Sequence, residues 1–290
     1  MLKGTIIKGI GGFYYVNTEQ GIYACRARGI FRKDGIKPTV GDSVEISVLD
    51  EKDKEGSLDV IEKRKTLLIR PRVANVDQAV IVFAAKSPNM NLDLLDRFLI
   101  LVEEQQLDVV ICINKIDKDK TQQYEKIAAL YHSAGYPVLC VSAEKEIGIE
   151  DLKEVLQNKI SVFAGPSGVG KSSLINKAFP HAEMETGEIS KKIQRGRHTT
   201  RHAELIQIGE KSYIVDSPGF TSLYLENVTE QTLQYYFKEF QPYVHQCYYT
   251  GCSHTHEPDC AVKQQVNKSI SETRYHRYVT IYEELKERKK

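Results

Sequence analysis

The sequence predicts an α/β protein made of three parts, and three observations carry this prediction. Residues 1–65 show about five short strand patterns separated by turns, which is typical of a small closed β-barrel. From residue 76 strand and helix patterns alternate, as they do in a doubly wound sheet. Beyond residue 225 the chain is aromatic and polar, carries a Cys/His cluster and ends in a charged helical stretch. We expect domains at 1–65, 66–224 and 225–290.

The first part is predicted to be a barrel of the OB type. Its expected strands are 5–7, 13–16, 22–26, 43–46 and 58–61. We expect turns at Gly11-Gly12, at Asn17 and at Gly41-Asp42, because these residue types favour turns. Residues 51–57 are predicted to form a charged loop.

The second part follows a linker at Arg70-Pro71-Arg72 and has the pattern of an α/β sheet. Its expected strands are 79–84, 109–113, 138–141, 160–164, 204–208 and 212–215. Its expected helices are 92–104, 122–134, 149–157 and 172–178. The first of these helices is amphipathic, because its large apolar residues fall on one side.

Composition and charge narrow the class of protein. The chain has 290 residues, of which 41% are hydrophobic, and no apolar run reaches the roughly 18–20 residues that span a bilayer. Its start lacks the apolar region of a signal peptide, so we expect a cytoplasmic protein with no membrane contact. The net charge of +1 hides basic stretches at 1–40, 189–202 and 263–290, which favour a phosphate-rich partner such as nucleic acid over plain solvated surface.

Residues 165–172 match the phosphate-loop pattern GxxxxGK[ST] between a predicted strand and a predicted helix. Glycines let backbone N–H groups face the phosphates, and the helix N-terminus favours anions. Lys171 would reach the β- and γ-phosphates and would act in catalysis, while Ser172 would bind Mg²⁺. A glycine turn unrelated to nucleotides is the weaker alternative.

Asn114-Lys115-Ile116-Asp117 follows the predicted strand at 109–113 and indicates guanine specificity. The Asp117 carboxylate can accept hydrogen bonds from guanine N1–H and from the exocyclic amine, whereas adenine presents an acceptor there. Ser142-Ala143, after the next strand, is the expected second contact with the base.

The switch residues are expected on both sides of the predicted strand pair at 204–215. Asp216 would reach Mg²⁺ through water, and the Gly219 N–H would sense the γ-phosphate. Thr199 or Thr200 would complete the Mg²⁺ shell, and the sequence does not separate the two. Phe220 stands where Ras-like enzymes place a water-orienting Gln, so intrinsic hydrolysis should be slow. His198 is a candidate to orient the attacking water in place of that Gln. Its alternative role is an RNA contact or a structural contact.

These motifs occur in a permuted order, because the guanine box precedes the phosphate loop rather than following it. The predicted nucleotide-binding residues are Asn114, Lys115, Ile116, Asp117, Ser142, Ala143, Gly165, Pro166, Ser167, Gly168, Val169, Gly170, Lys171, Ser172, Ser173, Asp216 and Gly219. The fold class is therefore that of a circularly permuted Ras-like P-loop GTPase domain, with an N-terminal OB-fold barrel and a C-terminal zinc-binding, mainly helical domain.

A cluster of three cysteines and several histidines near the C-terminus predicts a metal site. Cys247, Cys252, His254 and Cys260 form a Cys₃His set that suits a closed structural Zn²⁺ site. From the residues alone, His245 and His256 compete with His254 as the fourth ligand. The remaining cysteines are isolated and expected to be buried and inert.

The chain resembles the RsgA (YjeQ/YloQ) family of circularly permuted GTPases over essentially its whole length. The segments that carry the resemblance are 165–173 (GPSGVGKSS), 196–200 (GRHTT), 216–220 (DSPGF) and the spacing Cys-x₄-Cys-x-His-x₅-Cys from residue 247. The resemblance implies His254 as the fourth zinc ligand, an OB domain that contacts rRNA, and a GTPase stimulated by the 30S subunit late in its assembly. It thereby implies GTP or GDP with Mg²⁺ as ligands, 16S rRNA as a partner, and a chain that we expect to act as a monomer.

Two other classes of function stay open. A nucleotide-switched RNA-binding scaffold with negligible turnover is favoured by Phe220. A zinc-dependent DNA-binding regulator with a vestigial nucleotide domain is weaker, because all five nucleotide motifs are intact.

Overall fold

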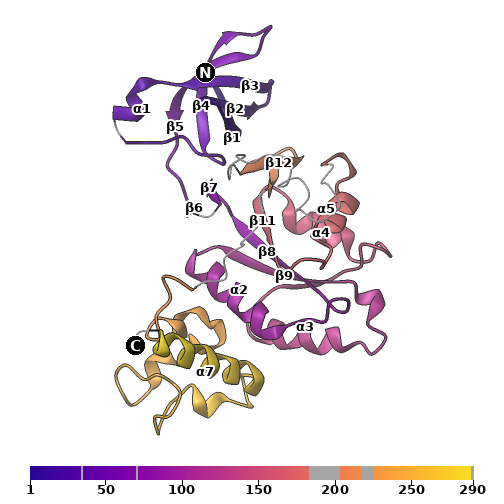
Figure 1. Cartoon of the computed structure of the whole chain (residues 1–290), viewed down its shortest axis with the longest axis vertical. Coiled ribbons are helices and arrows are strands. Elements are labelled where there is room, and N and C mark those ends of the chain that lie inside the picture. The colour runs from indigo at the N-terminus through magenta and orange to yellow at the C-terminus, as the bar shows by residue number, and fades with distance from the viewer. Residues whose placement is uncertain (34, 70, 183–202, 217–224, 289–290) are drawn as a thin grey trace. The chain divides into compact units, whose positions relative to one another are not determined.

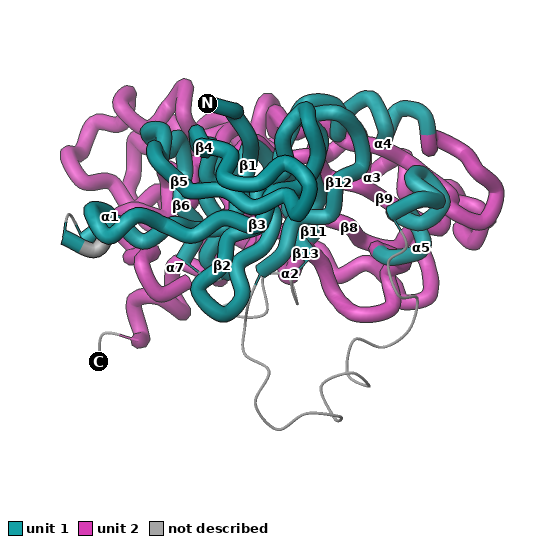
Figure 2. The backbone as a smooth tube through the Cα atoms, turned by 90° about the horizontal axis from the view of Figure 1, so that it is seen from above, with its two compact units in different colours: residues 1–79, 150–163, 172–221 teal, residues 80–149, 164–171, 222–290 magenta. Residues whose placement is uncertain are grey.

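The computed structural model describes residues 1–33, 35–69, 71–182, 203–216 and 225–288. These residues form two compact units (Figure 2). The first unit comprises 1–79, 150–163 and 172–221, and the second comprises 80–149, 164–171 and 222–290. Each unit thus combines segments from distant parts of the sequence.

The N-terminal part of the first unit is a closed five-stranded barrel in the order β1-β2-β3-β5-β4 (Figure 1). Its elements are β1 (Leu2–Ile10), β2 (Phe13–Thr18), β3 (Gly21–Ala27), α1 (Gly29–Lys33), β4 (Ser43–Asp50) and β5 (Glu55–Ile61). β3 and β5 pair in parallel, and the other pairs are antiparallel. Fully buried side chains such as Ile6, Tyr23 and Leu58 fill the interior. The predicted OB-like barrel is confirmed.

Two expectations for the barrel were wrong. Asn17 is not a turn residue but lies inside β2, opposite Ile22 of β3, and its side chain donates to the Tyr213 hydroxyl at 2.9 Å. The charged loop is shorter than 51–57, because β5 begins at Glu55. A Cβ at Gly56 would come within 2.9 Å of the Cys25 sulfur, so the glycine lets β5 pair closely with β3 despite its polar start.

The linker after the barrel forms a two-stranded pair, β6 (Leu67–Ile69) and β7 (Arg72–Ala74). Gly41 has φ +91°, and a Cβ there would lie 2.0 Å from the Ala74 carbonyl oxygen. Fully buried Asp42 accepts two hydrogen bonds from Arg64, at 2.6 and 2.9 Å. The linker is therefore held against the barrel by a close backbone approach and a charge-assisted pair.

A six-stranded sheet has the order β10-β9-β8-β11-β13-β12. Its strands are β8 (Gln78–Ala84), β9 (Asp108–Asn114), β10 (Val138–Cys140), β11 (Ile160–Ala164), β12 (Glu204–Gly209) and β13 (Ser212–Asp216). The helices between them are α2 (Leu92–Glu104), η1 (Ile116–Lys118), α3 (Gln123–Ser133), α4 (Ile149–Leu156), α5 (Lys171–Ala178) and η2 (Pro180–Ala182). All residues of β8 and β11 are buried, as expected of central strands covered on both faces.

The C-terminal segment of the second unit consists of short helices followed by one long helix. They are η3 (Leu233–Tyr236), η4 (Lys238–Phe240), η5 (Val244–Gln246), η6 (Lys263–Gln265) and α7 (Glu272–Glu287). Phe237, Phe240 and Tyr278 lie at the centre of its apolar core, to which Ile100 of α2 also belongs. Because the segment is rich in polar residues, its sequence did not indicate an apolar core of this size.

A buried charge network joins this segment to α2 and α3. Fully buried Arg274 donates to both Asp96 and Glu239, and Asp96 also accepts a bond from the Tyr131 hydroxyl at 2.8 Å. Such a network is costly if any member is removed, because an unpaired charge would remain in the interior. Within the described part of the chain, no helix is long and apolar enough to cross a membrane.

Candidate functional site

The predicted phosphate loop lies between β11 and α5, where the local backbone requires glycine. Gly165 has φ +132°, and a Cβ there would come 2.1 Å from the Val82 carbonyl oxygen of β8. Gly170 has φ +95°, and its Cβ would lie 2.5 Å from the Asn114 amide nitrogen. The loop therefore packs against two neighbouring strands at positions that no larger residue can occupy.

Lys171 lies with its ammonium group at the carbonyls of this loop. Its Nζ donates to the oxygens of Gly165 at 2.7 Å and Pro166 at 2.8 Å. Burial lowers the pKa of Lys171, and among the described residues it forms no ion pair with a carboxylate. A half-buried cation that has only neutral acceptors among the described residues is well suited to a phosphate group.

Asn114 at the end of β9 connects three segments. It is 2% exposed, its Nδ2 donates to the Val169 carbonyl at 2.9 Å, and its Oδ1 accepts from the Ala143 N–H at 3.3 Å. The next residue, Lys115, donates to the Gly168 carbonyl at 2.6 Å. The predicted guanine box, the predicted second base contact and the phosphate loop are therefore adjacent in the second unit.

Asp117 is positioned by the second base segment. The Ser142 hydroxyl donates to Asp117 Oδ1 at 2.5 Å, and it accepts from the Lys145 N–H at 3.1 Å. The other oxygen, Oδ2, has no hydrogen-bond partner among the residues that the structure describes. The carboxylate is thus fixed through one oxygen and can accept from a ligand through the other.

Of the remaining predicted site residues, the structure describes only some. Ser172 is in the first turn of α5, and Asp216 is the exposed last residue of β13, which runs parallel to β11. Parallel strands end at the same edge of a sheet, so Asp216 is at the edge where β11 ends. His198, Thr199, Thr200, Gly219 and Phe220 lie outside the described residues, and their predicted roles stay predictions.

The predicted metal ligands come together in the C-terminal segment. The ligand atoms of Cys247, Cys252, His254 and Cys260 all lie within 4.8 Å of one another. The sulfurs of Cys247 and Cys260 are 3.8 Å apart, and His254 Nδ1 lies 3.5 and 3.3 Å from them. A tetrahedral site with zinc–sulfur bonds of about 2.3 Å needs about 3.8 Å between its sulfurs. The four side chains therefore fit a single metal ion.

Residues around the cluster orient the histidine. Nε2 of His254 lies 2.7 Å from Gln234 Oε1, and the backbone oxygen of His254 accepts from the Tyr275 hydroxyl at 2.8 Å. A hydrogen bond on the second imidazole nitrogen fixes which nitrogen faces the metal. Sequence reasoning missed Gln234, which lies 20 residues before its partner with no motif to mark it. His245 and His256, the competing candidates, are exposed and are not part of the cluster.

The chain is similar to known proteins over its whole length. A family model described as RsgA GTPase matches residues 61–226, and one described as RsgA N-terminal domain matches residues 3–58. A protein of Alkaliphilus metalliredigens named "Small ribosomal subunit biogenesis GTPase RsgA" is 47% identical, with 100% of both chains covered. One of Clostridium beijerinckii with the same name is 48% identical and covers 100% of this chain and 99% of its own.

Two solved structures are similar over nearly the full length. The crystal structure of YjeQ from Thermotoga maritima has a TM-score of 0.85 and 37% identity, and 98% of each chain is covered. YloQ, described as a circularly permuted GTPase, has a TM-score of 0.83 and 39% identity, with 99% of this chain and 96% of that one covered.

Proposed function

The chain belongs to the RsgA family and is a circularly permuted GTP hydrolase, and from that premise we propose that it acts in late maturation of the small ribosomal subunit. In this proposal it binds the 30S particle, hydrolyses GTP to GDP and phosphate, and is stimulated by the particle. The observation that carries the nucleotide chemistry is the bridge that Asn114 forms between the phosphate loop and Ala143. The ribosomal role is supported by the names of the relatives.

The described residues suit distinct parts of a guanine nucleotide. Asp117 would accept from the base, and the Ala143 region would contact its carbonyl. Lys171 would compensate the charge on the β- and γ-phosphates, and the backbone of 165–173 would donate to them. Mg²⁺ would be held by Ser172 and Asp216, with Thr199 or Thr200 completing the shell, and would neutralise charge between the phosphates.

Hydrolysis in this proposal depends on the ribosomal particle. Phe220 offers no group that can orient the attacking water, so the free protein lacks one catalytic element. His198 is the proposed substitute, flanked by Lys191, Lys192, Arg195, Arg197 and Arg201. Contacts between this basic run and rRNA phosphates would bring His198 to the water. An RNA or structural role for His198 is the alternative.

The metal is proposed to be Zn²⁺ with a structural role. Three sulfurs and one imidazole form the donor set that zinc prefers, and four protein ligands leave no open position for catalysis. Burial raises the pKa of the Cys252 thiol to about 12, so the thiolate form depends on a nearby cation.

We further propose that residues 1–65, 66–224 and 225–290 act as an rRNA-binding barrel, a GTPase domain and a zinc-binding domain. The matches to the two family models, at 3–58 and 61–226, support the first two boundaries. The basic stretches at 1–40 and 263–290 would contact 16S rRNA phosphates. We expect the protein to work as a cytoplasmic monomer.

The test is phosphate release in the presence of purified 30S, 50S and 70S particles. We expect stimulation by 30S alone and a steep loss of that stimulation as salt rises, because counterion release drives phosphate contacts. Equal stimulation by 50S would refute the proposed partner. Nucleotide-dependent 30S binding without stimulated turnover would support the scaffold alternative. A His198→Ala variant with full stimulated activity would refute only the catalytic role of His198.

A further inference from the structure

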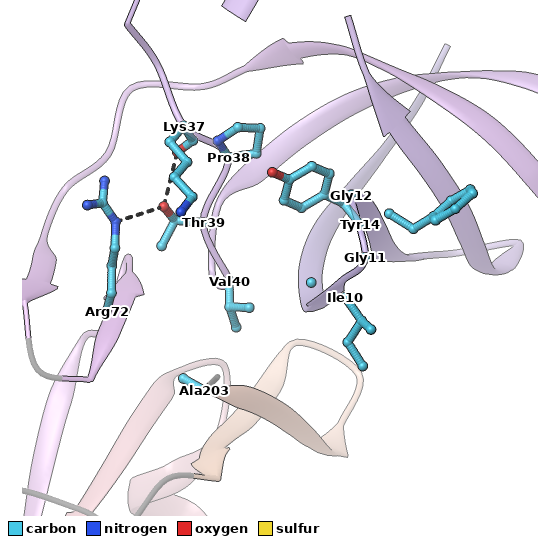
Figure 3. A pocket seen from close by; sticks show the side chains of 12 residues that line it. Ile10, Gly11, Gly12, Tyr14, Lys37, Pro38, Thr39, Val40, Arg72 and Ala203 are labelled. Atoms are coloured by element: carbon cyan, nitrogen blue, oxygen red, sulfur yellow. Dashed lines mark hydrogen bonds between the residues drawn. The ribbon is translucent and has the colours of Figure 1, made fainter. Parts of the chain in front are cut away.

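Within the first unit, the barrel contacts the hairpin of β12 and β13, and the GTP chemistry described above does not use this contact. Residues 9–14 and 37–40 line a hollow of about 350 Å³ together with Arg72 and Ala203, which directly precedes β12 (Figure 3). β12 is the edge strand of the six-stranded sheet, next to β13. An edge strand is paired on one side only, so its contacts with the barrel help to set its position.

Lys8 of β1 makes the first polar contact with the hairpin. Its Nζ lies 2.8 Å from Oε1 of Glu204, the first residue of β12. Regular alternation along β1 would turn Lys8 into the barrel together with the fully buried Ile6. The pairing of β1 with β2 skips Ile7, however, which marks a bulge between the two. Bulges re-aim side chains, and this one leaves the Lys8 amine outside the barrel, where it meets the hairpin.

Asn17 of β2 makes the second polar contact. Its Nδ2 donates to the Tyr213 hydroxyl at 2.9 Å, and Tyr213 is 5% exposed. The Tyr213 backbone is fixed as well, because its N–H donates to the Lys159 carbonyl at 2.9 Å. A largely buried polar group that loses its partner costs free energy, so this hydrogen bond favours one position of the hairpin against the barrel.

The hairpin connects both contacts to the predicted magnesium-binding carboxylate. β12 and β13 are antiparallel, with Glu204 directly opposite Asp216. Tyr213 is on the same strand as Asp216, three residues earlier. The barrel thus contacts the cross-strand partner of Asp216 and the strand that carries it. Because a misplacement of about 1 Å can cost about 100-fold in rate, contacts that add little stability can still matter for catalysis.

We propose that Lys8 and Asn17 are positioning residues for GTP hydrolysis, which hold the hairpin so that the Asp216 carboxylate reaches magnesium through water. This assignment rests on the proposed role of Asp216 and not on the ribosomal partner. Neither barrel residue touches the nucleotide, and both act through the hairpin. The barrel therefore has a function in the isolated enzyme, apart from any partner that it binds.

The test uses the full-length protein without ribosomal particles. Lys8→Glu places like charges together at Glu204 and should lower kcat for intrinsic GTP hydrolysis about tenfold. The Mg²⁺ concentration for half-maximal binding of a fluorescent, non-hydrolysable GTP analogue should rise about threefold, the scale of a partly exposed charge pair. GDP affinity in EDTA should change less than about twofold, because the guanine box and Lys171 are in the second unit.

Charge exchange distinguishes a positioning role from general damage. Lys8→Glu combined with Glu204→Lys restores an ion pair of reversed polarity and should return kcat to within about threefold of the parent. Asn17→Ala and Tyr213→Phe should each lower kcat, and their combination should lower it no further than the stronger of the two, since both remove one hydrogen bond.

Lys3→Glu is the matched control, because Lys3 is on the same strand but pairs with Glu45 and Glu62 of the barrel region. It should change kcat less than about twofold. Equal losses in Lys8→Glu and this control, or a charge exchange that restores nothing, would overturn the positioning role.

Asp216→Asn separates this proposal from the proposed function. An unchanged magnesium requirement in Asp216→Asn would refute the magnesium role of Asp216 and the positioning role with it. A raised requirement in that variant, but not in Lys8→Glu or Asn17→Ala, would refute the positioning role alone. Failure of 30S particles to stimulate hydrolysis would refute the ribosomal role and leave a positive result here standing.

Discussion

The phosphate loop and the metal cluster are both in the second unit, yet they are built in opposite ways. The loop is a backbone site: its glycines allow main-chain groups to approach β8 and β9, and the strand and helix on either side hold it. The cluster is a side-chain site: four ligands within residues 247–260 converge among short helices and turns. The shape of the loop thus depends on backbone packing against neighbouring strands, whereas the cluster would be completed by its ion.

This difference teaches where each site should be vulnerable. Removal of one side chain from the loop should reduce ligand binding and leave the fold intact, because the sheet maintains the geometry. Removal of one ligand from the cluster should affect folding of the segment first, because metal binding and folding are coupled where regular structure is sparse.

The largest effect is expected from the metal ligands. Cys252→Ala should abolish stoichiometric metal binding and unfold the C-terminal segment, since structural zinc contributes on the order of 10 kcal/mol in small domains. GDP affinity should change less than about threefold, because the ligands lie outside the nucleotide loop. Metal analysis and GDP titration check this, with Cys140→Ala, at a half-buried cysteine outside the cluster, as control. Full metal content with native stability would contradict the site.

A smaller effect is expected from the phosphate-loop cation. Lys171→Ala should lower kcat/KM for GTP roughly 10²–10³-fold, because a charge that stabilises the transition state is lost. Its melting temperature should stay close to that of the parent, since the lysine bonds only to loop carbonyls. Stimulated phosphate release and thermal unfolding would be compared with Lys153→Ala, which removes a surface cation from α4. Loss of fold instead of rate would contradict the comparison.

A change at Asp117 should alter base specificity, whereas a change at the nearby Asp119 should alter stability. Asp117→Asn should weaken GTP about 10- to 100-fold and improve xanthine nucleotides, because an amide donates where the carboxylate accepted. Asp119→Asn is the matched control, since Asp119 binds the Thr121 hydroxyl at 2.6 Å and the Tyr124 N–H at 3.1 Å at the start of α3. The control should lower stability and keep guanine preference. Competition between GTP and XTP decides, and equal preference in both variants would refute the guanine contact.

The smallest effect is expected from Glu257, whose carboxylate lies in the segment 247–260 of the Cys/His cluster. Burial alone would raise the pKa of Glu257, but hydrogen bonds from Ser253 outweigh it and lower the pKa to about 2. A lowered folded-state pKa stabilises the fold above the unfolded value, near 4.5, and this contribution is lost as pH falls toward 2. We expect Glu257→Gln to cost about 1 kcal/mol at pH 7, discounted for partial exposure.

Denaturant unfolding at pH 7 and pH 5 with metal content verified would measure this cost. Glu283→Gln, at a surface position on α7 paired with Lys286, is the control and should be near neutral. The cost of Glu257→Gln should be similar at both pH values, because the carboxylate is ionised at each. A cost that vanishes at pH 5 would contradict the assigned pKa.

The sequence by itself determined most strands and helices of the α/β sheet, the motifs and their permuted order. Hydrophobic periodicity placed the strand at 160–164 and the helix at 92–104, and the structure has both with the same bounds. The glycine spacing around Lys171 and the Cys/His spacing could also be recognised from the local sequence, without knowledge of the segments that pack against them. Such features are local, because backbone conformation and ligand type are properties of the residues themselves.

Only the tertiary structure decided which distant groups meet. Asn114 meets Val169 across 55 residues, Arg274 meets Asp96 across 178, and Gln234 is paired with His254 of the Cys/His cluster. The early start of β5 also depends on a distant segment, because the polar Glu55 is part of the barrel through its pairing with β3. No local sequence pattern predicts which distant group a side chain will contact. Such a contact depends on how the whole chain folds and on burial, which removes competing water.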